Sequence, residues 1–422
     1  MLPVFNDYIK FLNYKTNNEL NFLKEGKYWY DNSIVKGYDI NGELQKIVRL
    51  KIEEDLSIQT KFYKNYEKIE LETWQDTIER NKKHLEEIEE ESFELIKQSR
   101  DIYKDNKIAI LTSTGKDSQV VEHLVKKLYK EEPLVIFNNT SLDCADSYLF
   151  IKKEENDLKI INPKEGFYQW RERINFVPTR FSRACCGIFK EGAMVEALDK
   201  NDSYLFFMGM RNQESSGRSG YGDYWDNTKW GKRDWHGVLP IRKWSEEEVW
   251  LYILKEQMDF NPKYRKGYSR VGCAVACPYY SKSTWVLDEY WYPYLFNRWR
   301  DILREDFRKN NKDLIMNCTE EEYLTCWSGG VYRPEPTEEV IKQFCERNEL
   351  DYEVGKTFFG HTCEKCGKKI KAKEVIGMNL KFNGRNIEKF YCKKHLKEIL
   401  NIDEEQWEQY VKDFKSRDCK LF

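Results

Sequence analysis

The chain has 422 residues, of which 40% are hydrophobic and 15% aromatic, and it contains only 22 Gly and 10 Pro. This composition excludes a fibrous or wholly disordered protein and predicts a globular chain with more than one domain. Basic and acidic residues nearly balance, at 70 and 72. No global positive field therefore draws the whole protein onto nucleic acid, and any such contact must come from a local patch.

The N-terminal sequence, residues 1–15, has neither a basic segment followed by an apolar stretch nor a small-residue cleavage site. No stretch approaches the ~18 consecutive apolar residues that a membrane helix needs. We therefore expect a cytoplasmic protein without a membrane partner. Twelve cysteines in that compartment favour metal ligands or redox groups over disulfides, because thiol buffers keep it reduced.

In chain order, residues 1 to about 70 mix aromatic side chains with short β-like runs such as 44–52 and carry no chemical motif. Residues 71–100 predict an amphipathic helix with a solvated acidic face. Its apolar positions are Trp74, Ile78, Leu85, Ile88 and Ile96.

From Lys107 onward, short apolar runs alternate with helical patterns, which predicts an α/β domain with a parallel sheet and crossover helices. A later helix is expected to begin near Ser245, where Glu248 completes a capping box. From about His361 a separate cysteine cluster predicts a small module. The expected strands are 108–111, 134–137, 158–161 and 204–208, and the first crossover helix carries Val121, Leu124, Val125 and Leu128.

The first informative motif is Ser113-Thr114-Gly115-Lys116-Asp117-Ser118, between the first expected strand and its helix. A glycine-containing turn at a helix start lets backbone N–H groups approach a phosphate, and the helix dipole favours the anion. Lys116 and the hydroxyls of Ser113 and Ser118 add donors. The motif is not the usual P-loop, because Ile110 stands where that loop needs glycine. The alternative is a helix cap without function.

These residues resemble the PP-loop superfamily, whose signature is Ser-x-Gly-Lys-Asp-Ser and whose members bind adenine nucleotides. Further segments are similar to phosphoadenosine phosphosulfate reductases, although Asn139 and Ser141 depart from the family's Asp-Thr-Gly. The resemblance covers roughly residues 107 to 300. The similar segments are Asn139–Asp143, Gly209–Ser215 with Arg218, Pro240–Ser245, Asn261–Tyr264 and Gly267–Cys273.

The resemblance implies a PP-loop α/β domain at residues 101–310. An N-terminal β/helical appendage over 1–100, a helical connector over 311–360 and a zinc-binding module with a tail over 361–422 complete the expected organisation.

Arginines provide a second expected anchor for the nucleotide. Guanidinium groups make bidentate contacts to phosphate or sulfate oxygens, and Arg211 follows the end of an expected strand, where open α/β sheets bind ligands. The alternative is a surface ion-pair network. The expected nucleotide-binding residues are Ser113, Gly115, Lys116, Asp117, Ser118, Arg211, Glu214, Ser215 and Arg218.

Two cysteine pairs, Cys185-Cys186 and Cys273-x-x-x-Cys277, lie within the motif-rich region. Four thiolates suit an iron-sulfur cluster or zinc. A similar pair with Cys-x-x-Cys holds a 4Fe-4S cluster in adenylyl-sulfate reductases and in DNA-sulfur-modification enzymes, so the resemblance implies this cluster here. The second pair is one residue longer than theirs, and zinc or inert buried cysteines remain the alternatives.

A second cluster combines Cys363-x-x-Cys366 with Cys392-x-x-His395, a spacing typical of structural zinc. The stretch 377–390 between them is expected to supply a hairpin. Residues 361–400 contain eleven Lys and Arg against four acidic residues. A basic module of this kind can bind nucleic acid, and the alternative is a module that only stabilises the C-terminus.

The chain ends Arg417-Asp418-Cys419-Lys420-Leu421-Phe422, a loose similarity to the C-terminal catalytic cysteine of the assimilatory reductases. A thiolate between cations at Cys419 could attack a sulfate sulfur, the alternative being an incidental tail thiol. Cys144, after the second expected strand of the sheet, is another thiol near the ligand edge.

Three functions follow from the resemblance. The first is an oxidoreductase that reduces adenylyl sulfate or phosphoadenylyl sulfate to sulfite, with Cys419 and Lys116 as catalytic residues and a thiol reductant as partner. The second is an ATP-dependent sulfurtransferase that adenylylates a nucleic-acid acceptor, releases pyrophosphate and receives sulfur from a donor protein. The Lys116-Asp117 pair and the basic zinc module favour the second, whereas the Arg211–Arg218 stretch and Cys419 favour the first. The third is a nucleotide sensor without catalysis.

Overall fold

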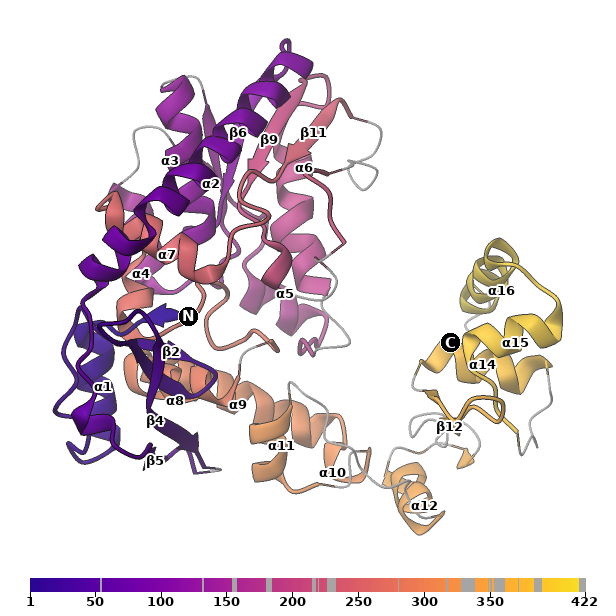
Figure 1. Ribbon diagram of the computed structural model, residues 1–422. Helices are drawn as coiled ribbons and strands as arrows, with labels where there is room; N and C mark the ends of the chain where they lie inside the picture. The colour runs from indigo at the N-terminus through magenta and orange to yellow at the C-terminus, as the bar shows by residue number, and fades with distance from the viewer. Residues whose placement is uncertain are drawn as a thin grey trace. The chain divides into compact units, whose positions relative to one another are not determined.

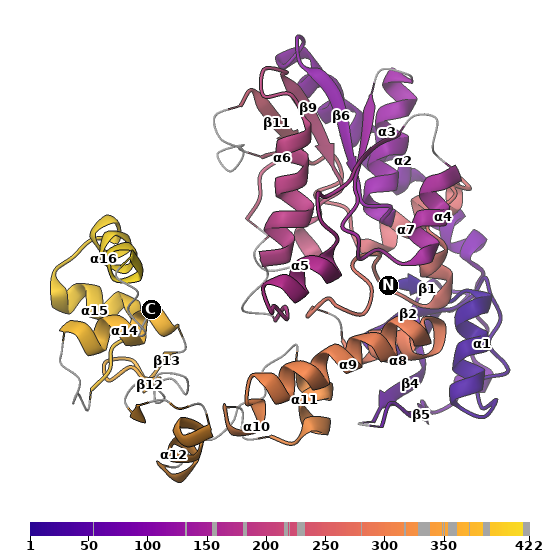
Figure 2. The same ribbon diagram turned by 180° about the vertical axis from the view of Figure 1, so that it is seen from behind.

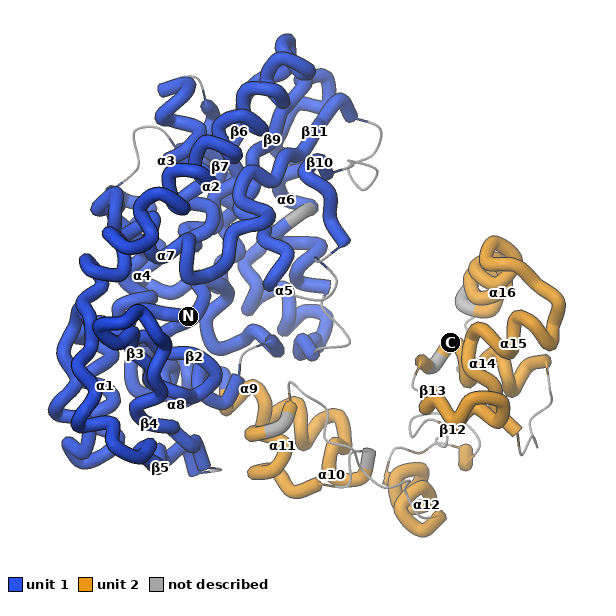
Figure 3. The backbone as a smooth tube through the Cα atoms, in the orientation of Figure 1, with its two compact units in different colours: residues 1–299 blue, residues 300–422 orange. Residues whose placement is uncertain are grey.

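The computed structural model describes two compact units, residues 1–299 and residues 300–422 (Figure 3). The finer boundaries expected at residues 100, 310 and 360 stay predictions. The described residues are 1–53, 55–130, 133–153, 158–179, 184–214, 218, 220–225, 233–279, 281–315, 318–327, 338–347, 349, 351–352, 361–370, 372–382 and 389–416.

The first unit opens with an antiparallel sheet of five strands in sequential order. Strand β4 confirms the β-like run expected there. Phe5, just after β1, packs its ring within 5.2 to 6.0 Å of the rings of Trp74, Trp250 and Phe260, so this sheet shares the core of the central domain. The elements are β1 (Leu2–Pro3), α1 (Asn6–Lys15), β2 (Trp29–Asp31), β3 (Ile34–Tyr38), β4 (Leu44–Ile52) and β5 (Ile58–Phe62).

Helix α2 (Trp74–Ile102) confirms the expected amphipathic helix. The Thr73 side chain accepts a hydrogen bond from the backbone N–H of Asp76, and the Asp76 carboxylate accepts one from the N–H of Thr73. This capping box satisfies donors that the first helical turn leaves unpaired. Four of the five apolar positions are buried, with Leu85 and Ile96 fully enclosed, and Ile88 is half-buried, because helical spacing places these residues on one face.

The central sheet has six strands in the order β10-β11-β9-β6-β7-β8, and the pairs from β11 to β8 are all parallel. Only β10 runs antiparallel, at the edge. The four strands predicted in this region are confirmed. Their bounds are β6 (Lys107–Thr112), β7 (Leu134–Asn138), β8 (Leu158–Ile161), β9 (Tyr204–Met208), β10 (Tyr224–Trp225) and β11 (Trp235–Val238).

Helices cover both faces of this sheet (Figures 1 and 2). Ile108 and Ile110 of β6 join a core with α2, α3 (Lys116–Tyr129) and α7 (Glu246–Lys255). Ala109, between them, joins the opposite core with α6 (Ala193–Ala197). This alternation follows from the two-residue period of a strand, and burial on both faces explains the continuous apolar runs. The capping box at the start of α7 is also confirmed.

The chain crosses the sheet in two directions, starting from β6. It runs outward through α3, β7, α4 (Ala145–Lys153) and β8, and then returns to place β9 on the other side of β6. The carboxyl ends of β6 and β9 therefore form a switch point, where open α/β sheets bind ligands. The expected parallel α/β fold is confirmed, and it places the Ser113–Ser118 loop at this point.

Three helical segments follow the sheet: η6 (Pro262–Lys266), α8 (Lys282–Trp291) and α9 (Pro293–Lys309). Asp288 on α8 is fully buried, and its carboxylate accepts a hydrogen bond of 2.8 Å from the hydroxyl of Tyr268. Burial raises the pKa of Asp288 to about 6, against the opposing influence of Lys263.

This raised pKa predicts a pH effect on stability. The protonated carboxyl is favoured in the folded state, so its contribution is complete below about pH 4 and is lost as pH rises through about 6. Asp288→Asn should remove that loss, and its stability relative to wild type should increase by about 2 to 3 kcal/mol between pH 4 and pH 7. Urea unfolding at the two pH values measures this, and parallel profiles for both proteins would contradict it.

The second unit is helical around a small hydrophobic core, formed by residues such as Ile376, Met378, Leu396 and Trp407. The hairpin expected over 377–390 is wrong for its first part, because residues up to Phe382 continue helix α14; the short strand pair surrounds the first cysteine knuckle instead. The elements are α10 (Lys312–Ile315), α11 (Glu320–Cys326), α12 (Glu338–Arg347), β12 (His361–Thr362), β13 (Lys369–Ile370), α14 (Lys373–Phe382), α15 (Lys393–Leu400) and α16 (Glu404–Ser416).

Among the helices that the structure describes, none is both long enough and apolar enough to span a membrane.

Candidate functional site

The loop Ser113–Ser118 joins β6 to α3 and offers backbone donors to an anion. Gly115 is the N-cap of α3. Because it has no side chain, a ligand can approach the backbone N–H groups at the start of the helix. Within the described residues, the N–H groups of Gly115, Asp117 and Ser118 have no hydrogen-bond partner. Unpaired N–H groups at the positive end of a helix dipole form an anion site.

Hydrogen bonds inside the loop fix its shape. The Ser118 hydroxyl donates to the carbonyl of Gly115 at 2.9 Å and accepts from the N–H of Ser113 at 3.3 Å. Thr114 takes a left-handed conformation with φ of 58° and donates its N–H to the hydroxyl of Thr112 at 3.2 Å. The Ser118 hydroxyl thus shapes the loop, in addition to any contact with a ligand.

The charged side chains of the loop are buried and paired. The Lys116 ammonium lies 3.0 Å from a carboxylate oxygen of Asp117 and 3.4 Å from one of Glu246. Burial alone would raise the pKa of Asp117, but Lys116 and Arg211 together hold it below its usual value. The same carboxylates raise the pKa of Lys116 against its burial. Both groups are therefore charged at neutral pH.

Gly209 and Arg211 bring the end of β9 against this loop. The guanidinium of Arg211 is 4% exposed and donates to the Asp117 carboxylate and, at 3.4 Å, to the carbonyl of Trp244. A Cβ on Gly209 would lie 2.5 Å from backbone atoms of Asp117 and Ser118. Only glycine permits this close approach of β9 to the start of α3.

The remaining predicted arginine, Arg218, pairs with Glu214, whose carboxylate also accepts from the N–H of Arg211. These three residues therefore lie together, joined by one ion pair and one backbone hydrogen bond. Ser215 lies outside the described residues.

The segment Asn261–Tyr264 contacts the loop through two side chains. The sequence had predicted no individual role for its residues. The Asn261 amide donates to the Thr114 hydroxyl at 2.9 Å, and the Tyr264 hydroxyl accepts from the N–H of Lys116 at 2.9 Å. Both side chains are at most 1% exposed. The motif match pointed to this segment, but sequence alone could not show that it reaches the loop.

Asn139 and Ser141, the two departures from the family pattern, lie in the segment after β7. Ser141 has φ of 56°, a conformation that glycine adopts most easily, and its hydroxyl accepts from the N–H of Phe167 at 2.7 Å. The Asn139 side chain accepts from the hydroxyl of Tyr148 at 2.8 Å and donates to Asn162 at 2.8 Å. Each replacement therefore makes hydrogen bonds of its own.

The two cysteine pairs lie within electrostatic range of each other. Cys186 opens a π-helical turn, and its neighbour Cys185 lies within electrostatic range of Cys273. The Arg270 guanidinium donates to the sulfur of Cys277 at 3.3 Å. Lys190 lies within electrostatic range of the same group, and its pKa is raised by Cys186, Cys273 and Cys277.

The surroundings of Cys185 and Cys273 disfavour the thiolate form of both side chains. Hydrogen bonding to Cys186, burial and neighbouring thiols raise the pKa of Cys185, and burial raises that of Cys273. The Lys190 ammonium opposes this effect at Cys273, because a nearby positive charge favours the thiolate. Cys144 is fully buried, and its sulfur lies 3.5 Å from the Ser147 hydroxyl.

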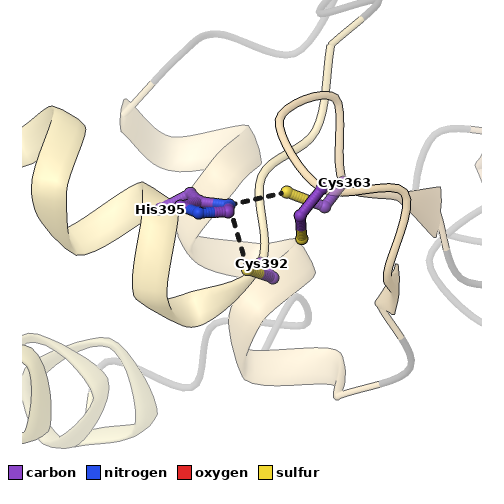
Figure 4. A group of neighbouring side chains, drawn as sticks. Cys363, Cys392 and His395 are labelled. Carbon is purple, nitrogen blue, oxygen red and sulfur yellow. Dashed lines mark hydrogen bonds between the residues drawn. The ribbon is translucent and has the colours of Figure 1, made fainter.

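The C-terminal group is compact. Ligand atoms of Cys363, Cys366, Cys392 and His395 all lie within 4.8 Å of one another, and it is the one such metal-binding group among the described residues. The Nδ1 atom of His395 lies 3.3 Å from the sulfur of Cys363 and 3.5 Å from that of Cys392 (Figure 4). Burial opposes ionisation of Cys363, but backbone hydrogen bonds and His395 lower its pKa to about 6. This group can hold a metal ion. Cys419 lies outside the described residues.

Fold and site together define an α/β protein with an anion-binding loop at a switch point and thiols on adjoining segments. The model of the phosphoadenosine phosphosulfate reductase domain matches residues 107–278. The resemblance inferred from the motifs is therefore confirmed over these residues, which make up less than half of the chain.

Curated relatives agree with this assignment. An uncharacterized protein of Methanocaldococcus jannaschii is 30% identical over 268 residues, which cover 62% of this chain and 61% of that protein. The adenosine 5'-phosphosulfate reductase of Halalkalibacterium halodurans is 24% identical over 192 residues, covering 43% of this chain and 79% of the reductase. The match thus spans about three fifths of the length of the first relative.

Two solved structures show weaker likeness. Phosphoadenylyl-sulfate reductase from Candida auris, in a phosphate complex, has a TM-score of 0.36 and 15% identity, covering 45% of this chain and 94% of that one. The U34-tRNA thiolase NcsA from Methanococcus maripaludis, with its 4Fe-4S cluster, has a TM-score of 0.32 and 15% identity, covering 57% and 76%.

Proposed function

We propose that the chain is an adenine-nucleotide-binding enzyme of sulfur chemistry that reduces adenylyl sulfate or phosphoadenylyl sulfate to sulfite. The observation that carries this proposal is the set of unpaired N–H groups of Gly115, Asp117 and Ser118 at the β6/β9 switch point. Oxygens of the nucleotide's phosphate or sulfate accept from these donors. Arg211, which pairs with Asp117 of the loop, and Arg218, which lies within electrostatic range of Asp117, provide guanidinium donors that suit phosphate or sulfate oxygens.

The proposed reaction uses two thiols. A thiolate, for which Cys419 is our candidate, attacks the sulfate sulfur; an S–S bond forms, the S–O bond to the phosphate breaks, and the adenosine nucleotide leaves with that electron pair. A thiol reductant then attacks the cysteine sulfur, forms a disulfide and releases sulfite. Two electrons pass from the thiols to the sulfonate. Lys116, at the phosphate, stabilises the charge of the leaving group.

Cys185, Cys186, Cys273 and Cys277 fit a 4Fe-4S cluster, because such a cluster takes four thiolates and places positive charge among them. The cluster would supply redox or electrostatic influence near the nucleotide. Cys363, Cys366, Cys392 and His395 fit structural zinc, because four ligands of this kind complete a tetrahedral site.

The cluster assignment predicts iron and sulfide in the purified protein. Prepared without oxygen, wild type should contain both, and Cys185→Ser should lose most of them. Cys144→Ser is the matched control, because this buried thiol lies outside the proposed ligand set, and it should retain them. A folded anaerobic wild-type sample without iron would rule the cluster out.

The nucleotide proposal is tested by thermal stabilisation with ATP, adenylyl sulfate and phosphoadenylyl sulfate. A ligand that binds only the folded state raises stability in proportion to its occupancy. Preference for a sulfated nucleotide, with sulfite formed in the presence of a dithiol and lost in Cys419→Ser, is the expected result. No stabilisation by any of the three would overturn the proposal.

A second candidate is ATP-dependent sulfur transfer to nucleic acid. It is favoured by the first knuckle of the C-terminal group, where residues 364–369 are all exposed and include Lys365, Lys368 and Lys369. Stabilisation by ATP alone, with pyrophosphate release that depends on added RNA or DNA, would favour this candidate over reduction. Tight nucleotide binding without any turnover would favour a sensor.

A further inference from the structure

We propose that Asn261 and Tyr264 are positioning residues that hold the phosphate loop in its anion-binding conformation before any ligand arrives. The inference rests on the proposed function in one respect, that the anion is part of a nucleotide. It concerns a segment 147 to 148 residues away in sequence, which reaches the loop through two hydrogen bonds.

The loop needs such support at Thr114. A β-branched residue with φ of 58° is strained, and strain of this kind persists only where surrounding contacts impose it. The Asn261 amide donates to the Thr114 hydroxyl at 2.9 Å, which fixes the side chain of the strained residue. The same conformation turns the chain from β6 toward Gly115, so the orientation of the free N–H groups depends on it.

Asn261 is itself held rigidly. Its amide nitrogen also donates to the Ser147 hydroxyl at 3.0 Å, and its carbonyl oxygen accepts from the N–H of Lys263 at 3.0 Å. The side chain is fully buried and caps η6, whose first residue is Pro262. With both amide hydrogens and the oxygen engaged, the group has one orientation, and it transmits that orientation to the loop.

Tyr264 fixes the other end of the loop. Its hydroxyl accepts from the N–H of Lys116, the first residue of α3, and its ring packs against Trp250 at a centroid distance of 5.1 Å. The Lys116 donor is thereby satisfied by protein, while the donors of Gly115, Asp117 and Ser118 remain available to a ligand. The two contacts, at residues 114 and 116, bracket the glycine.

The segment offers a matched control four residues along the chain. Tyr268 is also buried, at 2% exposed, and its hydroxyl makes a hydrogen bond of 2.8 Å, but to Asp288 and away from the loop. Tyr264→Phe and Tyr268→Phe therefore each remove one buried hydroxyl together with the hydrogen bond described for it. A general loss of packing would affect both variants, whereas a positioning role affects only the first.

The first experiment measures binding of adenylyl sulfate, ATP and inorganic pyrophosphate to the full chain, at a temperature where all variants are folded. Tyr264→Phe should weaken the binding of whichever ligand wild type prefers by roughly tenfold, as expected for one lost hydrogen bond. Tyr268→Phe should leave it within about twofold of wild type, as expected for a bond that does not touch the site. Equal effects of both substitutions would overturn the inference.

Hydrogen exchange in the unliganded protein tests the inference separately from the proposed function. Residues 113–118 should exchange faster in Tyr264→Phe and in Asn261→Ala, but not in Tyr268→Phe. If wild type binds no nucleotide and this pattern still appears, the proposed function fails while the positioning role stands. Unchanged exchange in both loop-contact variants contradicts the positioning role.

A double substitution tests the link to strain. Thr114→Gly removes both the strained side chain and the acceptor for Asn261. In that background Asn261→Ala should speed loop exchange much less than it does with Thr114 present. If the two substitutions are additive, Asn261 does not act through Thr114, and its part of the inference is wrong.

Discussion

Gly209→Ala is expected to abolish nucleotide binding and to destabilise the first unit. The added Cβ would lie 2.5 Å from backbone atoms of Asp117 and Ser118, and no side-chain rotation can relieve a clash with backbone. β9 and the start of α3 must move apart, which misplaces the N–H groups of the loop. We expect a loss of about 2 to 3 kcal/mol in unfolding free energy, as for other overpacked cores. Urea unfolding and nucleotide titration measure the two effects.

The control for this substitution is Gly220→Ala, because a Cβ there would meet nothing within 4 Å. It should leave stability and nucleotide binding as in wild type. Normal nucleotide binding by Gly209→Ala would show that the close approach of β9 does not shape the loop.

Cys363→Ser is expected to remove the metal from the C-terminal group and to unfold the small core around it. Cys363 is 1% exposed and belongs to that core together with Ile376 and Leu396. A core this small needs the binding free energy of a metal, and a serine hydroxyl is a poor replacement for thiolate. Zinc content should fall from about one equivalent to none, and limited proteolysis should cleave within residues 361–416.

Cys345→Ser is the matched control, because Cys345 is a buried cysteine of the same unit outside the ligand group. It should retain zinc and protease resistance. A strong chelator should reproduce the effect of Cys363→Ser on wild type. Protease resistance that survives complete removal of metal would contradict the structural role.

Periodicity and motif spacing were sufficient to predict four of the six strands of the central sheet, whereas β10 and β11 were not predicted. Buried parallel strands need continuous apolar runs, and each run sits beside a helix with its own amphipathic pattern, so β6, β7, β8 and β9 were all recognisable. The hairpin predicted for 377–390 was wrong for residues up to Phe382, because tertiary packing keeps this part of the chain helical. Met378 and Leu380 are buried in that helix.

The site could be predicted only in part. A motif names residues that are adjacent in sequence, such as Lys116 and Asp117, but not the partners that folding brings to them. Glu246, Asn261 and Tyr264 reach the loop from other segments through a carboxylate, an amide and a hydroxyl. The family resemblance marked the segment Asn261–Tyr264, but no local pattern showed which of these side chains reach the loop.

The pairing of charges at the loop has a kinetic consequence. Each cation beside the anion site already faces a carboxylate, so the site presents little net field to an approaching nucleotide. Diffusional encounter is then not accelerated by electrostatic steering, and the association rate depends only weakly on ionic strength. Affinity must come from slow dissociation, through the oriented N–H groups. The cations are Lys116, Arg211 and Arg218, and the carboxylates are Asp117, Glu214 and Glu246.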